Sequence, residues 1–353
     1  MKKILLSLLI GSSFAATAQS LVTENFNGLT IGNVSTETAG TVAGQGGYFL
    51  FSNNGAVPTT STNSAVTNTQ IVAGGNASQG LEITGPNGDK GSRFMWKNGL
   101  PTIWAARTLG NNIIEVEVDI NPGAGTTLSR NTFGIYIYNA AGDRILAGFF
   151  VRASTRELFL LAYSTPTGQP VGNYNYALAA APGIQLPANV FSRVGISYNK
   201  TTGQVLLKAP GVAPAGAAVA GSSAGVDPDE IDFISGSGNA TATPNTTFAT
   251  MVMDNMVARA SSTDTLLGTD SFTTASSFSV YPNPVRDLVT LEGSNDSNIQ
   301  SYQIADLNGR IVKSGNTVNT NSTQVNMSDL QSGVYMMTIN SDKGSTVKKI
   351  IKE

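Results

Sequence analysis

Short runs in which apolar and polar residues alternate fill most of residues 21–260, and turns rich in Gly, Asn and Thr separate them. The clearest run is residues 112–120, NIIEVEVDI, whose apolar and acidic side chains fall on opposite faces of an extended chain. A period of two residues predicts β-strands. Many such strands with polar turns between them predict a β-sandwich or jelly roll.

Composition supports an all-β chain and removes several kinds of chemistry. Charged residues make up 12% of the chain, about half the usual share, so a helical bundle with charged outer faces is not expected. The chain has no Cys and no His, which excludes Ser-His-Asp and Cys-His catalysis and ordinary zinc sites. The net charge is -2 with no basic patch, so we expect no nucleic-acid partner.

The first 18 residues, MKKILLSLLIGSSFAATA, have the pattern of a secretory signal peptide. Lys2 and Lys3 precede a short apolar run, and Ala16-Thr17-Ala18 is a small-residue cleavage motif. We therefore expect cleavage between Ala18 and Gln19. No other segment is apolar enough over sufficient length to predict a transmembrane helix.

Residues 227–230, Asp-Pro-Asp-Glu, interrupt the strand pattern. Asp at the N-cap, Pro at the first helical position and Glu at the third predict one capped helical turn. Asp227, Asp229 and Asp232 also have the spacing of a Ca²⁺ loop, but the glycine that such a loop needs is absent.

The last ~75 residues have a strand pattern of their own, which predicts six or seven short strands and a small immunoglobulin-like sandwich. Asn308-Gly309 is a tight-turn signal between two of these strands. Pro282 and Pro284 have no N–H to donate, so they predict an edge or entry segment. A Ser/Thr-rich stretch, residues 261–277, has the composition of a linker and precedes this region.

Four blocks of residues 278–353 resemble the type A C-terminal sorting domain of the type IX secretion system of Bacteroidetes. They are FSVYPNPVRD, DLNGR, LQSGVYMMTI and VKKIIK, in that order. The resemblance implies export through the periplasm to the outer cell surface or the medium. It also implies removal of the domain by a sortase-like protease and attachment of the remainder to surface lipopolysaccharide, or its release.

Within that resemblance the expected signal residues are Pro282, Asn283, Pro284, Gly309, Gly333, Tyr335, Lys348 and Lys349. Glycine supplies turn conformations that other residues resist. Lys348 and Lys349 lie on opposite faces of one strand, so at least one should be exposed. Protection of a sheet edge against aggregation is an alternative explanation for both lysines.

The strands around residues 112–120 and 191–210, with the final MDNM of residues 253–256, resemble the concanavalin A-like, or laminin-G-like, jelly roll. The resemblance implies a structural Ca²⁺ that joins the first strand to the last, with Glu24 and Asp254 as the matching ligands. Oxygen ligands suit such a hard cation. The alternative is that both residues are ordinary carboxylates of a turn or a strand edge.

Two further patterns bear on activity. Glu115 and Glu117 lie on one strand face and resemble part of the E-x-D-x-x-E block of laminarinase-type hydrolases, but Asn121 and Pro122 follow where the second acid would stand. Trp96 and Trp104, the only tryptophans, flank residues 97–101 and could form a stacking surface for sugars, or could pack in the core.

The sequence thus predicts a signal peptide (1–18), a jelly-roll cargo domain (19–260), a linker (261–277) and a sorting domain (278–353). We expect a secreted or cell-surface protein without enzymatic activity that binds glycan. The alternative is a polysaccharide-cleaving glycoside hydrolase that uses Glu115 or Glu117.

Overall fold

The computed structural model describes residues 18–53, 61–76, 78–88, 90–125, 128–238, 245, 247–267, 278–293, 298–306, 310–341 and 344–353. The chain divides into two compact units, residues 1–268 and 269–353. Both units are built almost entirely of β-strands, as the alternating sequence predicts. The expected signal peptide lies outside the described residues except for Ala18, and the first strand begins at Gln19.

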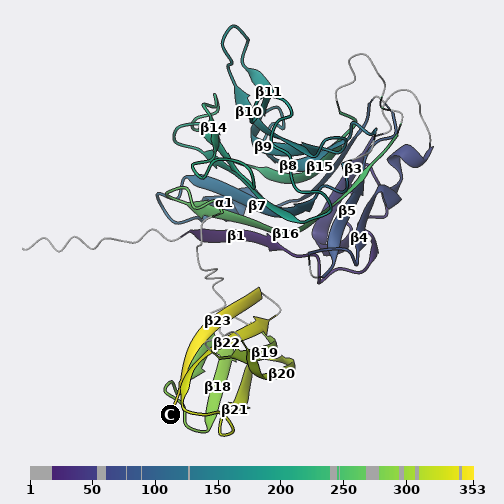
Figure 1. The fold of residues 1–353 in the computed structure, drawn as a ribbon. Helices are drawn as coiled ribbons and strands as arrows, with labels where there is room; N and C mark the ends of the chain where they lie inside the picture. The colour runs from purple at the N-terminus through teal and green to yellow at the C-terminus, as the bar shows by residue number, and fades with distance from the viewer. Residues whose placement is uncertain are drawn as a thin grey trace, which may run out of the picture. The chain divides into compact units, whose positions relative to one another are not determined.

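The first unit is a sandwich of two antiparallel sheets (Figure 1). The nine-stranded sheet contains, in spatial order, β14 (Ala217–Val219), β13 (Val205–Lys208), β12 (Ser192–Asn199), β7 (Ile113–Asn121), β16 (Thr250–Ser261), β5 (Gly80–Thr84), β4 (Thr69–Val72) and β2 (Gly32–Asn33), with β1 (Gln19–Glu24) paired to β16. The seven-stranded sheet contains β11 (Gly172–Ala177), β10 (Glu157–Ser164), β9 (Ile145–Arg152), β8 (Thr132–Tyr138), β15 (Glu230–Gly236), β6 (Ser92–Lys97) and β3 (Tyr48–Ser52).

The helices of this unit are short. They are α1 (Leu100–Ala105) and the 3₁₀ turns η1 (Gln45–Gly47), η2 (Ser61–Ser64) and η3 (Val66–Asn68). Pro101 stands at the start of α1, where its missing N–H costs nothing, and Leu100 and Trp104 are buried beneath the helix. No helix within the described ranges has the length and apolar character needed to cross a membrane.

The core lies between the two sheets and follows the alternation of each strand. On β7 the four apolar side chains predicted to share one face, Ile114, Val116, Val118 and Ile120, are all fully buried in it. The seven-stranded sheet contributes its own inward-facing residues, and a second apolar cluster lies on the opposite side of the same strands. Both faces of this sheet are therefore largely apolar.

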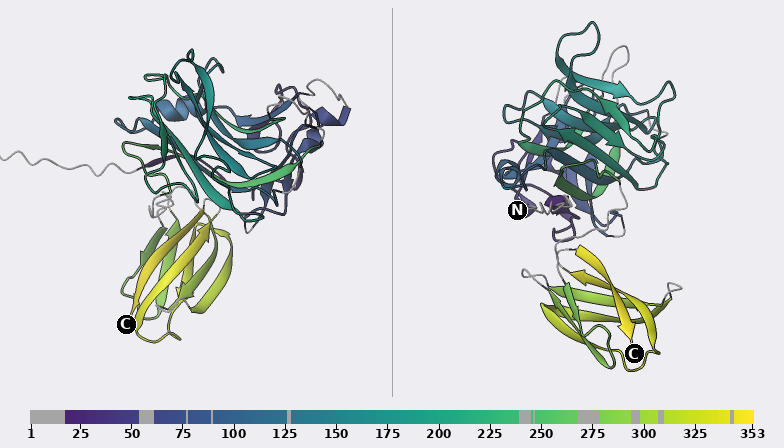
Figure 2. Two further views of the ribbon diagram at one scale, coloured as in Figure 1. Left: turned by 45° about the horizontal axis from the view of Figure 1, so that its top comes forward. Right: turned by 90° about the vertical axis from the view of Figure 1, so that its left-hand side faces the viewer.

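The second unit is a smaller sandwich of a three-stranded and a four-stranded sheet (Figure 2). The first sheet contains β17 (Phe278–Tyr281), β18 (Leu288–Gly293) and β21 (Ser322–Asn326); the second contains β20 (Ile311–Thr320), β19 (Ile299–Ala305), β22 (Gly333–Ser341) and β23 (Gly344–Lys352). Its core is separate from that of the first unit. The chain is thus a jelly-roll β-sandwich followed by a small immunoglobulin-like sandwich, as expected.

Two local expectations differ from the structure. Residues 227–230 do not form a helical turn, because β15 begins at Glu230 and pairs with β8 along seven residues. The expected linker also begins later than residue 261. The Leu266 side chain is 1% exposed and packs where Gly195 of β12 has no side chain, so the segment directly after β16 belongs to the first unit.

Candidate functional site

The outer face of the seven-stranded sheet carries a row of apolar residues, interrupted at Gly134, which has no side chain. Cross-strand pairing places six residues of six adjacent strands side by side, in the order Phe159, Phe150, Gly134, Ile234, Phe94 and Phe51. Adjacent strands lie about 4.8 Å apart, so the row is roughly 24 Å long. We call this row, together with Phe49, Trp96, Tyr136 and Tyr138 on the same side of the sheet, the aromatic face.

The rings of the aromatic face support one another. Phe150 and Phe159 stack with centroids 4.8 Å apart, and Phe49 and Trp96 stack at 5.7 Å. Tyr136 and Tyr138 meet edge to face at 5.9 Å. Phe150 and Phe159 are buried, so the accessible rings of this face are those of β3, β6 and β8, where Phe51 is exposed and the others are half-buried. Half-exposed rings that support one another are the kind of surface on which sugar rings stack.

A pair of carboxylates lies within this face. Asp232 stands opposite Tyr136 in the β8–β15 ladder, and Glu230 stands opposite Tyr138. Asp232 is 3% exposed, and its Oδ1 has no hydrogen-bond partner among the described residues. Burial raises the pKa of Asp232 well above its ordinary value, and the charge of Glu230 raises it further. Burial also raises the pKa of Glu230.

Glu115 and Glu117 lie on the other sheet and face away from the core. Glu115 is fully buried, and its carboxylate accepts the backbone N–H of Thr265 at 2.6 Å and pairs with Arg259. Glu117 pairs with Arg193 at 3.1 Å and with Arg259, and it accepts the backbone N–H of Leu267. Both acids therefore lie almost without solvent exposure in an ion cluster with Arg193 and Arg259, beneath residues 264–267.

The two tryptophans have different environments. Trp96 belongs to β6 and to the aromatic face, where it is half-buried. Trp104 of α1 is 2% exposed, its indole N–H donates to Asp227 at 2.6 Å, and Arg107 covers its ring at 3.9 Å. Trp104 therefore offers no ring face to a ligand, and the two side chains do not form the joint stacking surface that the sequence suggested.

The two carboxylates expected to bind Ca²⁺ are each already paired with other groups of the protein. Glu24 accepts hydrogen bonds from the Phe26 backbone N–H and the Tyr48 hydroxyl, and its Oε2 lies 2.8 Å from the Lys97 ammonium. Asp254 is fully buried and accepts the backbone N–H groups of Asn76 and Asn255. Among the described residues, no three acidic, His or Cys side chains are grouped as metal ligands. The donor groups around Glu24 and Asp254 thus do not fit Ca²⁺.

Burial raises the pKa of Asp254 to about 6. The charges of Asp119 and Glu24 contribute to this shift.

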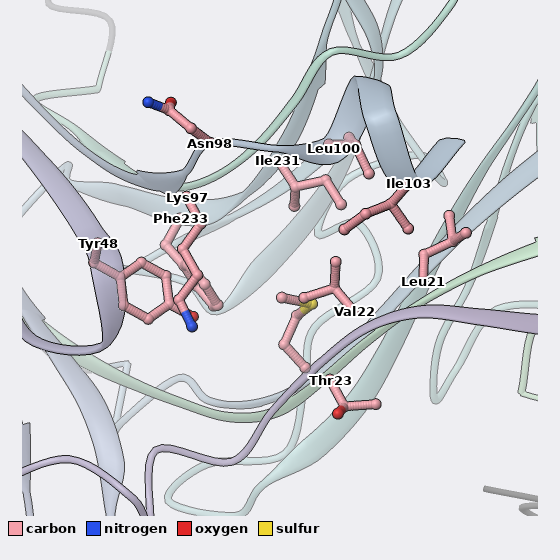
Figure 3. A pocket seen from close by; sticks show the side chains of 11 residues that line it. Leu21, Val22, Thr23, Tyr48, Lys97, Asn98, Leu100, Ile103, Ile231 and Phe233 are labelled. Carbon is pink, nitrogen blue, oxygen red and sulfur yellow. The ribbon is translucent and has the colours of Figure 1, made fainter. Parts of the chain in front are cut away.

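A cavity of about 320 Å³ lies at one end of the sandwich, beside β1 and α1 (Figure 3). Most of its lining is apolar, from Leu21 and Val22 on one side to Ile231 and Phe233 on the other. Its polar end is formed by Tyr48 and Lys97, whose ammonium lies 4.2 Å from the Tyr48 ring centroid. Lys97 is already neutralised by Glu24, so this end does not provide a free charge for a ligand.

In the second unit, the two ends of the expected sorting signal contact each other. The Asn283 side chain donates to the Lys349 carbonyl and accepts the Ile351 N–H, both at 2.8 Å. The next residues continue this contact, since Val285 pairs with Lys352 as a parallel bridge. The Asn283 amide therefore acts as one more peptide group along the edge of β23.

The same part of the chain matches a known family. Residues 279–353 match the model of the secretion system C-terminal sorting domain. This unit is a sorting domain. The sorting domain directs export to the cell surface or the medium, and it implies an interaction with the type IX secretion machinery.

The other expected residues of the sorting domain serve different parts of it. Gly333 begins β22 opposite Lys352, and Tyr335 is buried in the core, with its hydroxyl donating to the Gln331 carbonyl at 2.8 Å. Lys349 is exposed and Lys348 is half-buried, as the strand alternation predicts. Pro282 and Pro284 flank Asn283 between β17 and the bridge at Val285, which agrees with an entry segment. Gly309 lies outside the described residues.

Comparisons of the whole chain show only distant folds. No curated protein matches it in sequence. Alginate lyase vAL-1 from Chlorella virus is similar at 9% identity and a TM-score of 0.38, over 61% of this chain and 93% of that chain. A mutant of alginate lyase Aly36B is similar at 12% identity and a TM-score of 0.41, over 69% of this chain and 98% of that chain. The binding domain of botulinum neurotoxin serotype C1 is similar at 12% identity and a TM-score of 0.37, over 91% of this chain and 74% of that chain. Likenesses at this level carry no argument about activity or ligand.

From the sequence, Glu230 is expected only in a helix cap and Asp232 only in a Ca²⁺ loop, and their pairing on one strand face is not predicted. The available signal was their alternation, Glu-Ile-Asp-Phe, which is the same pattern that predicted β7 from residues 112–120. The capping pattern of residues 227–230 obscured it. The aromatic face gave no local signal, because its residues come from strands distant in the sequence.

Proposed function

We propose that the first unit binds a glycan chain on its aromatic face without cleaving it, and that the sorting domain delivers it to the outer surface of a Bacteroidetes cell or to the medium. The partly exposed rings of β3, β6 and β8 on the aromatic face support this proposal, because stacking on aromatic faces is the main apolar contact open to a sugar. Polar groups beside the rings, among them Glu230 and Tyr138, are available to hydroxyls.

The arrangement of acids supports binding over hydrolysis. A glycoside hydrolase needs two carboxyl groups on either side of the scissile bond. Glu230 and Asp232 are hydrogen-bonded to each other on one strand, so they do not lie on either side of a sugar bond. Glu115 and Glu117, the acids of the alternative hydrolase hypothesis, are paired with arginines on the opposite sheet.

A glycan array followed by titration calorimetry on the best ligand tests the proposal. Phe51→Ala and Trp96→Ala should each weaken binding about tenfold or more, because each removes a stacking ring. Phe248→Ala is the matched control, since Phe248 is 53% exposed and lies outside the aromatic face. Equal affinity of all three variants, or no glycan ligand for the wild-type protein, would contradict the proposal.

We also propose that a sortase-like protease removes the sorting domain during export and that the first unit is then attached to surface lipopolysaccharide or released. The separate cores of the two units support this step, since cleavage between them leaves each core intact. Mass spectrometry of the mature protein from cells and from medium tests it. A mature protein that still contains residues 278–353 would contradict it.

A further inference from the structure

Glu230 and Asp232 form an acidic site without a matching cation. Burial is the largest cause of the raised pKa of each residue. The nearby charges that raise these pKa values further are also acidic: Asp229 acts on Glu230, and Glu230 acts on Asp232. No ion pair of the described residues includes either side chain, whereas the buried acids of β7 are each paired with an arginine. The two acid clusters of this unit are therefore built differently.

The Asp232 carboxylate is also an incomplete hydrogen-bond acceptor. The Asp232 carboxyl has a hydrogen bond with Glu230, but its Oδ1 is buried without a partner within the described part of the chain, and the residue is only 3% exposed. Buried acceptors in folded proteins nearly always have a partner, so one that lacks it indicates a missing donor. That donor must approach from the aromatic face, because the inward side of β15 is filled by Ile231 and Phe233.

The side chains beside the pair restrict what that donor can be. Tyr136 and Tyr138 lie directly across the ladder, and the Tyr136 ring also covers Gly148, where any Cβ would approach Tyr136 Cδ1 to 2.8 Å. Aromatic ring faces attract ammonium groups. Carboxylates form their strongest hydrogen bonds with positively charged N–H donors.

We propose that Glu230 and Asp232 bind the protonated amine of an amino sugar, so that the preferred glycan is one with free amino groups. This inference rests on the proposed glycan-binding function of the aromatic face. An ammonium group supplies both the donor that Asp232 lacks and the positive charge that the pair lacks, while Tyr136 and Tyr138 lie beside it. An N-acetylated sugar supplies neither the charge nor the full set of donors, and a uronic acid is repelled.

The test measures the binding of three oligosaccharides of equal length by calorimetry at low ionic strength. They are oligomers of glucosamine, of N-acetylglucosamine and of a uronic acid. The wild-type protein should bind the glucosamine oligomer about tenfold more tightly than the N-acetylated one, and should bind the uronic acid most weakly. In Glu230→Gln and Asp232→Asn this preference should disappear, so that each variant binds the amino and N-acetylated oligomers with similar affinity. Glu82→Gln on β5 of the other sheet is the matched control and should keep the preference for the glucosamine oligomer.

The outcomes separate the two proposals. Equal affinity of the wild-type protein for the amino and N-acetylated oligomers overturns the amino-sugar inference and leaves glycan binding intact. A preference that survives in both acid variants also overturns it. Failure of every oligomer to bind overturns both proposals. Melting temperatures of the variants are measured first, and a variant that does not fold is replaced by Glu230→Ser.

Discussion

Thr265 donates its backbone N–H to the Glu115 carboxylate across 2.6 Å, although the two residues are 150 positions apart in the sequence. The contact attaches the segment after β16 to the outer face of β7. Burial raises the pKa of Glu115, while hydrogen bonds from Thr265 and the charge of Arg259 oppose that rise. The arrangement indicates that Glu115 stabilises the fold.

Glu115→Ala should therefore lower the free energy of unfolding of the first unit by about 3 kcal/mol, because it breaks a buried charge cluster. Denaturant unfolding followed by Trp fluorescence measures this change, since both tryptophans belong to that unit. Glu82→Ala should cost less than about 0.5 kcal/mol, as expected for a site without such partners. A stable Glu115→Ala protein that has lost a polysaccharide-cleaving activity of the wild type would support the hydrolase alternative.

Removal of the sorting domain should stop export. A chain that ends at residue 277 retains the expected signal peptide and the first unit, so it should reach the periplasm and remain there. Immunoblots of periplasm and medium measure its distribution. The matched experiment attaches residues 278–353 to an unrelated periplasmic reporter, which should then appear outside the cell. Efficient appearance of the truncated chain in the medium would contradict this prediction.

The Asn283 contact gives a finer test of the sorting domain. Asn283→Ala removes two hydrogen bonds to the edge of β23, so it should lower the stability of this domain by about 1–2 kcal/mol. Export should fall in parallel, because the two ends of the signal are no longer joined. Asn316→Ala is the control, since Asn316 is exposed on β20. Normal stability combined with normal export of Asn283→Ala would show that the contact is dispensable.

Calcium should not stabilise the first unit through Glu24. Lys97 already lies 2.8 Å from that carboxylate and supplies its positive charge. We therefore expect a chelator to leave the melting temperature unchanged, within about 1 °C. Lys97→Met is expected to destabilise the unit by leaving Glu24 without its cation. A fall of many degrees on chelation would instead support the calcium site that the jelly-roll resemblance implies.

The sequence predicted the strands well and the environment of their outer faces poorly, for a physical reason. Residues 112–120 alternate so regularly that β7 and its inward side could be assigned directly. Whether the acids of β7 contact water or arginines depends on Arg193, Arg259 and residues 264–267. These come from distant parts of the chain and are brought to β7 by its pairing with β12 and β16. At Glu230 the local capping pattern predicted a helical turn, and pairing of β15 with both β8 and β6 overrode it.

The pair on β15 should make stability depend on pH in a direction opposite to that of ordinary ion-paired acids. Burial and mutual repulsion raise the pKa of Asp232, and burial raises that of Glu230, so the folded state holds protons that the unfolded state has released. The contribution of these protons to the stability of the folded state is fully present below the pKa values of the unfolded chain, near 4. It is lost as the pH rises through the pKa values of the folded state. Each unit of upward shift corresponds to about 1.4 kcal/mol.

Asp232→Asn should reduce the loss of stability with rising pH, because the amide stays neutral at every pH. The free energy of unfolding of the first unit, measured by urea titration at pH 5 and at pH 8, should fall between these values in the wild type and fall less in the variant. At pH 8 the variant should be more stable than the wild type by about 1 kcal/mol. Glu82→Gln serves as control and should follow the wild-type profile. Identical profiles for Asp232→Asn and the wild type would show that the pair ionises freely, in which case it already has a cation or donor partner.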